Sequence, residues 1–229
     1  MQLLYEDSHL LVCVKPVGIL SQRDASGKPN LEDLLQQHLS ASGSCAAVYP
    51  VHRLDQAVGG VMVYAKTKHC AARLSQAIQS GGVLKQYLAI IHGVLEPASG
   101  FYRDYLFKDA AKNKSYVVKT LRKGVKEASL EYETLQTGTC CFGPVSLVRI
   151  QLHTGRTHQI RVQFASRKRP LVGDGKYGSS QSNCGIALWS YQLRFAHPVQ
   201  GTLLVFTQEP PQQLPWTLMD SAPLEKGAP

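Results

Sequence analysis

The sequence lacks several features that would place the chain in large classes of protein. No apolar run approaches the roughly 20 residues of a membrane-spanning helix, and the first residues carry two acids and no basic cluster. We therefore expect neither a membrane partner nor a signal peptide. None of the six cysteines forms a Cys-x-x-Cys pair, which argues against a zinc site. Without an export signal we expect free thiols in a reducing, cytoplasmic compartment and no bound metal.

Signs of nucleotide binding and of division into several domains are also missing. The glycine-rich stretch 170–178 does not have the spacing of a P-loop. No internal repeat or long linker interrupts the 229 residues, a length that suits about one to two domains. We expect a single domain over 1–229, with a proline-rich, partly flexible tail at 209–229.

The charge of the chain is strongly one-sided. Lysine and arginine number 25 against 16 acidic residues, which gives a formal net charge of +9. Such a balance favours a polyanionic partner such as a nucleic acid. Charge alone does not decide the matter, because many basic proteins bind no nucleic acid.

Hydrophobic periodicity and capping residues predict an alternation of strands and helices. Helices are expected to begin after Asn30, after Thr67 and near Arg156. The strands that we expect span residues 10–14, 61–65, 87–91, 116–119, 128–136, 145–152, 186–195 and 202–206.

Three ionisable residues, His52, Arg53 and Asp55, precede the apolar run 61–65. We expect Asp55 and the glycine pair at 59–60 to lie in the turn that feeds this buried strand. Polar side chains at the mouth of a buried element are typical of reactive sites. The alternative is that Asp55 simply pairs with Arg53 or His52 at a strand end.

A second dense stretch covers residues 152–162. A helix that begins near Arg156 would present free backbone N–H groups close to that guanidinium, and together they suit a phosphate. Arg161 falls beside apolar positions of the same helix, where a buried guanidinium needs a carboxylate partner. Asp55 is an available partner.

Taken together, these stretches resemble the RluA-type pseudouridine synthase family, with ordered motifs from about residue 3 to residue 207. The resemblance implies an α+β fold: a mixed, largely antiparallel bent sheet with flanking helices around a central basic cleft. The matching blocks are Tyr5-Glu6-Asp7 through Lys15-Pro16-Val17-Gly18; His52-Arg53-Leu54-Asp55 with Gly60 and Ala65-Lys66; Lys85-Gln86-Tyr87-Leu88-Ala89 with Gly93; and Thr154 to Val162 with 170–178 and His197-Pro198.

The resemblance also implies roles for individual residues. Asp55 is similar to the essential aspartate of the family, and Arg161 to the arginine that pairs with it. Tyr87 is similar to the tyrosine that stacks on the target uracil, although its pattern alone would suit a core tyrosine. Arg53 is similar to the arginine that fills the space of the flipped-out base. The remaining residues predicted to contact RNA are His52, Arg156, Thr157 and His158.

The chain departs from the family at two places and lacks one module. Val58-Gly59-Gly60 stands where the family usually has Thr-Ser-Gly, and Gln163 stands where histidine is usual. Both bear on the rigidity of the catalytic loop and its phosphate contacts, and so on the rate and the precise target. The catalytic match begins almost at Met1, so we expect no S4-type RNA-binding module and expect the catalytic domain itself to recognise RNA.

The reaction that the resemblance implies is redox-neutral, so we expect no cofactor. Asp55 would either attack the anomeric carbon to form an ester or remove the 2′ proton to form a glycal. Transfer RNA and ribosomal RNA are both open as substrates, and we expect a monomer. The alternatives are a non-catalytic RNA-binding or RNA-folding protein on the same scaffold, and a nucleoside hydrolase.

Overall fold

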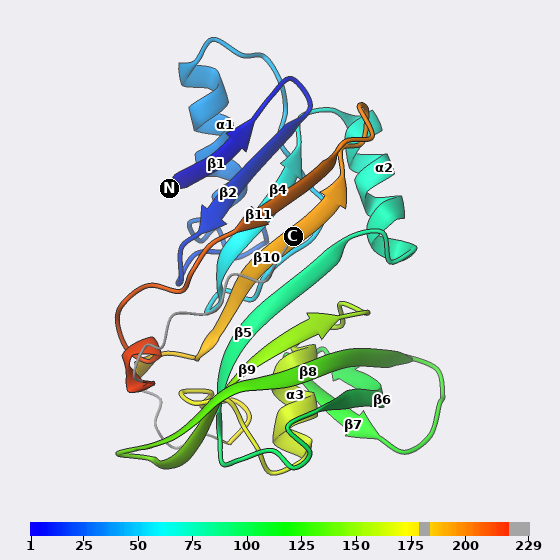
Figure 1. Ribbon diagram of the computed structural model, residues 1–229. Helices are drawn as coiled ribbons and strands as arrows, with labels where there is room; N and C mark the ends of the chain where they lie inside the picture. The colour runs from blue at the N-terminus through cyan, green and yellow to red at the C-terminus, as the bar shows by residue number, and fades with distance from the viewer. Residues whose placement is uncertain (179–183, 220–229) are drawn as a thin grey trace.

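The computed structural model describes residues 1–178 and 184–219, which form one long twisted sheet with helices on both faces (Figure 1). The described strands run in the order β1-β2-β4-β10-β5-β9-β8-β6-β7, with β11 beside β10 and β3 beside β4. Their bounds are β1 Gln2–Glu6, β2 Leu10–Lys15, β3 Tyr49–Pro50, β4 Gly59–Ala65, β5 Leu84–His92, β6 Ser99–Asp109, β7 Lys114–Val118, β8 Val125–Cys140, β9 Gly143–Leu152, β10 Leu188–Ala196 and β11 Leu203–Thr207. Helices are α1 Leu31–Ala41, α2 Lys68–Gln79 and α3 Gln159–Ser166, followed by a short 3₁₀ turn at Trp216–Leu218.

The first half of the sheet is buried on both faces. In β2, Leu11 and Cys13 pack with α1, whereas Leu10 and Val12 pack with α2 on the opposite face. This two-sided burial explains why β2 and β4 are nearly continuous apolar runs. Helix α3 shares its core with α1, so α1 and α3 cover the same face of the sheet.

Strand β10 joins the two halves of the sheet. It pairs parallel to β4 at only two positions, while the other described neighbours pair antiparallel, as the predicted largely antiparallel sheet requires. The strands approach closely here because of two glycines. A Cβ on Gly59 would collide with the ring of Trp189, and one on Gly60, whose φ is +118°, would collide with the backbone of Ser190.

Those glycines correct one prediction. They lie inside β4 and not in the turn that precedes it, because close contact with β10 extends the ladder back to Gly59. Gly59, one of the residues that depart from the family pattern, therefore has a packing reason.

The other predicted elements correspond to strands or helices of the structure, with two differences. Strands β1, β3 and β6 were not among the expected strands, and α3 begins at Gln159, three residues after Arg156. Of the predicted tail, residues 209–219 include the 3₁₀ turn, whose Trp216 and Leu218 pack against a small core cluster with Met219. Residues 220–229 lie outside the described residues.

Candidate active site

Asp55 lies in the loop between β3 and β4, and buried hydrogen bonds fix that loop. The Ser21 hydroxyl donates to the carbonyl oxygen of Leu54, and the Leu54 N–H donates to the same hydroxyl, both at 2.9 Å. The fully buried Lys15 ammonium donates to the carbonyls of Pro16, Ile19 and Gln56 at 2.7 to 3.3 Å. These hydrogen bonds fix the backbone of the loop and therefore the position of Asp55. The Asp55 side chain is 29% exposed.

The carboxylate of Asp55 contacts the guanidinium of Arg161. Arg161 Nη1 donates to Asp55 Oδ2 at 3.0 Å, so the predicted pairing is confirmed. The other edge of the guanidinium is held by Asp174, with Nε–Oδ2 at 2.8 Å and Nη2–Oδ1 at 2.7 Å. Burial opposes the charge on Arg161, but the hydrogen bond and charge of Asp174, and then Asp55, raise its pKa. Arg161 is therefore a permanent cation beside Asp55.

His158 contacts the same carboxylate from a strained position. It precedes α3 with φ +54° and ψ +26°, a left-handed conformation that is uncommon for histidine. Its Nδ1 lies 2.9 Å from the hydroxyl of Tyr177, which accepts the Ser115 N–H at 2.7 Å, and its Nε2 lies 3.7 Å from Asp55 Oδ2. A proton on Nε2 satisfies both sides, because Tyr177 then donates to Nδ1 and N–H faces the carboxylate. Burial lowers the pKa of His158, although Asp55 opposes the shift.

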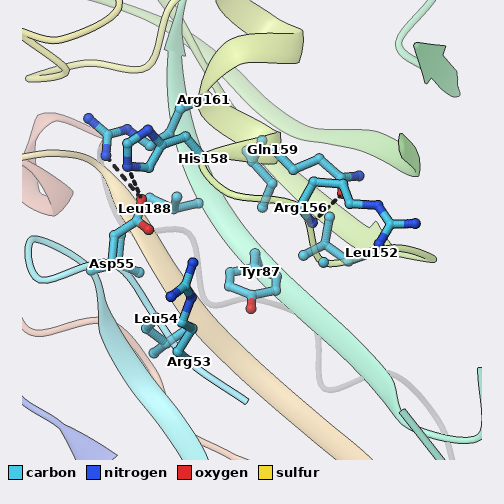
Figure 2. A pocket seen from close by; sticks show the side chains of 13 residues that line it. Arg53, Leu54, Asp55, Tyr87, Leu152, Arg156, His158, Gln159, Arg161 and Leu188 are labelled. Carbon is cyan, nitrogen blue, oxygen red and sulfur yellow. Dashed lines mark hydrogen bonds and ion pairs between the residues drawn. The ribbon is translucent and has the colours of Figure 1, made fainter. Parts of the chain in front are cut away.

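Tyr87 projects from β5 and forms one wall of the pocket beside Asp55 (Figure 2). It packs in the same core cluster as Val58 and Leu152 and is 6% exposed. Burial and then the nearby charge of Asp55 raise the pKa of its hydroxyl, so the phenol is neutral. A neutral aromatic ring on the wall of a small pocket can stack on a planar ligand.

Arg53 is exposed and points into the space between Asp55 and Tyr87 (Figure 2). Its Nη2 donates to the hydroxyl of Thr157 at 3.3 Å, which joins the two motifs across the pocket. The structure thus brings most predicted residues together. Predicted site residues that line this one pocket are Arg53, Asp55, Tyr87, Arg156, His158 and Arg161.

His52 lies beyond this pocket and lines an adjoining groove. Its Nε2 accepts the backbone N–H of Val63 at 3.1 Å, which ties the loop to β4. Burial and then the charge of Lys85 lower the pKa of His52 to about 3, so the ring is neutral at physiological pH.

The predicted phosphate site at a helix start beside Arg156 needs correction. Because α3 begins at Gln159, Arg156 lies in the preceding loop, and its backbone N–H donates to Gln159 Oε1 at 3.0 Å. The side chain of Gln159 therefore occupies the N–H group that the prediction left free. The Arg156 guanidinium donates from Nε to the carbonyl of Glu127 at 2.9 Å.

Two residues of the network, Asp174 and Tyr177, were not singled out from the sequence. Both lie in the glycine-rich stretch 170–178, where no periodic pattern marks a buried side chain. A signal was available in the chemistry of Arg161. Its guanidinium has two hydrogen-bonding edges, so a buried arginine that pairs with Asp55 on one edge needs a second acceptor on the other.

Among residues 1–178 and 184–219, no group of three histidine, cysteine or acidic side chains is arranged to hold a metal ion. The same residues contain no helix that is long and apolar enough to cross a membrane. Chemically, the pocket offers a half-exposed carboxylate held by a permanent cation, beside a neutral aromatic ring. Such a carboxylate can act as a nucleophile or a base on a planar ligand.

Comparison with known proteins places this geometry in context. The family model described as RNA pseudouridylate synthase matches residues 9–166. The chain is 31% identical over 207 residues to an uncharacterized RNA pseudouridine synthase, YhcT, of Bacillus subtilis, covering 90% of this chain and 67% of that protein. It is 33% identical to an uncharacterized RNA pseudouridine synthase of Aquifex aeolicus, with coverages of 93% and 70%.

A third relative is ribosomal large subunit pseudouridine synthase D of Zymomonas mobilis, 30% identical, with coverages of 93% and 70%. Among solved structures, human RNA pseudouridylate synthase domain containing 4 superposes with a TM-score of 0.74 at 24% identity, covering 92% of this chain and 89% of that one. That similarity confirms the predicted fold.

Proposed function

The chain belongs to the RNA pseudouridylate synthase family, and on that premise we propose that it isomerises specific uridines of transfer or ribosomal RNA through Asp55. Membership makes it an isomerase that acts on RNA. The observation that supports the role of Asp55 is its 3.0 Å contact with Arg161 in a pocket walled by Tyr87.

Conversion of uridine to pseudouridine breaks the bond from N1 to C1′ and forms one from C5 to C1′. The proton at C5 leaves and N1 gains one, so the change is redox-neutral and needs no cofactor. Asp55 would either attack C1′ and later leave it, or take the 2′ proton and return it. Arg161 supports both routes, because its hydrogen bond holds the carboxylate in a fixed orientation.

The target base must leave the RNA stack before Asp55 can reach its sugar. Unstacking costs a few kcal/mol, and stacking of the extruded uracil on Tyr87 would return about 1–3 kcal/mol. Arg53 reaches across the pocket mouth to Thr157 and is free to fill the vacated space in the RNA. His158 would orient Asp55, and His52 and Arg156 would face the RNA backbone.

We further propose that the chain works as a single-domain monomer in the cytoplasm, without metal or cofactor. In support, one chain supplies the whole pocket, and the ribosomal RNA synthases it resembles are named for the large subunit. The alternative of a non-catalytic RNA-binding protein rested on Val58-Gly59. The close contact of Gly59 with Trp189 of β10 gives that glycine a role in packing and weakens this support.

The direct test is Asp55→Asn, which keeps the shape of the side chain but removes its charge. We expect the rate of pseudouridine formation in cellular RNA to fall by about 10⁴-fold while RNA affinity is retained. Mapping pseudouridines in a deletion strain that expresses either form identifies the target RNA. Unchanged modification by the variant would contradict the assignment, and release of free uracil by the wild type would point to a hydrolase.

A further inference from the structure

The active-site pocket continues into a larger groove on the side away from Asp55. The groove shares Arg53, Tyr87 and Arg156 with the pocket, and it extends past His52 to the C-terminal end of α2 at Gln79. Among the described residues that line it there is no aspartate or glutamate. The groove is therefore open to a ligand that carries negative charge.

Lys85 is a buried cation of this groove for which the described residues provide no anionic partner. It precedes Tyr87 by two positions on β5, so both side chains project from the same face of the sheet. The residue is only 7% exposed, and its ammonium lies 3.6 Å from the position that a Cβ of Gly155 would take. Within the part of the chain that the structure describes, the Lys85 ammonium forms no ion pair with a carboxylate and no hydrogen bond with a carbonyl oxygen.

Arg156 approaches Lys85 from the loop after β9. Both side chains line the groove, and burial and then the charge of Arg156 lower the pKa of Lys85. Arg156 has no carboxylate partner among the described residues either, since its one side-chain contact is the Glu127 carbonyl. A buried ammonium close to a second cation is unfavourable unless an anion joins them.

We propose that Lys85 and Arg156 grip one backbone phosphate of the RNA strand that flanks the target uridine. This rests on the proposed function, because it takes the strand to run from the pocket into the groove. A phosphate suits the site, since it has several acceptor oxygens and can bridge an ammonium and a guanidinium. Gly155 leaves open the space beside the ammonium that a side chain would fill.

The test measures binding of a short single-stranded oligouridylate as a function of salt for Lys85→Gln, Arg156→Gln and the double variant. We expect each single change to weaken binding about tenfold at low salt. The slope of log affinity against log salt should fall by about 0.7, the value for one phosphate on a single strand. Because both cations contact the same phosphate, the loss in the double variant should be smaller than the product of the single losses.

The matched control is Lys68→Gln, which removes the same charge from an exposed position at the opposite end of α2. The change that Lys68→Gln causes in affinity and in the salt dependence of binding measures only the loss of one positive charge outside the groove. A neutral methylphosphonate linkage scanned along the oligouridylate should weaken wild-type binding at one position, and that position should make no difference to the double variant. Equal behaviour of Lys85→Gln and Lys68→Gln would overturn the proposal.

Two further measurements keep the outcomes distinct. Should Lys85→Gln fail to fold, Arg156→Gln in the exposed loop reports on the same phosphate. Pseudouridine formation by the same proteins reports separately on the proposed function, because the binding assay needs no turnover. Modification by the wild type with unaltered binding by both variants removes the phosphate site alone, whereas altered slopes without any modification would remove the isomerase assignment alone.

Discussion

The cations around Asp55 and those of the adjoining groove differ in what neutralises them. Arg161 is held on one edge by Asp174 and on the other by Asp55, so its charge is balanced within the protein. Lys85 and Arg156 line the same groove, and within the described chain neither pairs with a carboxylate. Yet Tyr87 lines both the pocket that contains Asp55 and Arg161 and the groove that contains Lys85 and Arg156.

The difference separates two tasks. A balanced network is complete before the substrate arrives, so Asp55 needs no rearrangement to be oriented. An unbalanced pair is completed only by an anion, so it contributes to binding rather than to the stability of the free protein. Changes to the first region should therefore destabilise the fold, and changes to the second should weaken RNA binding.

The largest effect on stability is expected for Asp174→Ala. It leaves the buried Arg161 with one of its two partners, and loss of one member of a buried pair costs about 3–5 kcal/mol of the free energy of unfolding. Urea denaturation measures the loss. The control is Glu133→Ala, which breaks the exposed pair with Arg149 and should cost less than about 1 kcal/mol. Equal losses in the two variants would show that the network is not the structural anchor described above.

Tyr177→Phe removes one hydroxyl from the second contact of Asp55. The Ser115 N–H and His158 Nδ1 lose their partner, so we expect a loss of about 1–2 kcal/mol in stability. His158 also loses the contact that fixes its tautomer, and kcat should fall about tenfold with little change in KM. Single-turnover kinetics on target RNA separate the two constants. A rise in KM at constant kcat would instead place Tyr177 in RNA binding.

A smaller effect is expected in the pH dependence of His52. Its pKa is about 3 in the folded chain and near 6.5 when unfolded, so the unfolded state binds more protons between these values. The stability that the neutral ring contributes is full above pH 6.5 and is lost as the pH falls toward 3. The stability difference between wild type and His52→Asn should therefore shrink by about 1 kcal/mol between pH 6 and pH 5.

Urea denaturation at a series of pH values measures this difference. The exposed Gln76 on α2 provides the control, because Gln76→Asn changes no group that titrates in this range. A constant difference between wild type and His52→Asn over this range would mean that the ring is not kept neutral by burial.

The smallest effect is expected for Thr157→Ala. Its hydroxyl receives a 3.3 Å bond from the exposed Arg53, and such surface contacts change stability by less than about 0.5 kcal/mol. The free Arg53 should still reach RNA, so kcat/KM should change less than about threefold. A loss near that of Arg53→Ala would show that Thr157 itself contacts the substrate.

Local pattern predicted the elements whose burial is visible in their own residues. Asn30 caps α1 and Leu31, Leu35 and Leu39 line its buried face, so helix and partner were both readable from spacing. Strand β6 escaped because Arg103 and Asp104 interrupt its apolar alternation. Its extended state depends on a nine-residue ladder with β8, which no local pattern records.

The site shows the same division. Motifs identified Asp55, Tyr87 and Arg161, but the shared guanidinium and the Tyr177–His158 contact depend on residues that meet only when the chain folds. The start of α3 was placed too early because Thr157 and Arg156 suit a first helical turn. The left-handed conformation of His158 instead sets the boundary, and it depends on tertiary contacts with Tyr177 and Asp55.

Strand β10 has a consequence for how the protein is made. It lies between β4 and β5 in the sheet, yet more than a hundred residues separate it from β4 in the chain. During translation the facing edges of β4 and β5 therefore emerge without their shared neighbour, and exposed strand edges are prone to wrong pairing. Asp55 likewise has no Arg161 to pair with until α3 has been synthesised. A nascent chain that stalls before β10 would hold β4 and β5 without the strand that lies between them, so the loop of Asp55 and the strand of Tyr87 would not yet belong to one sheet.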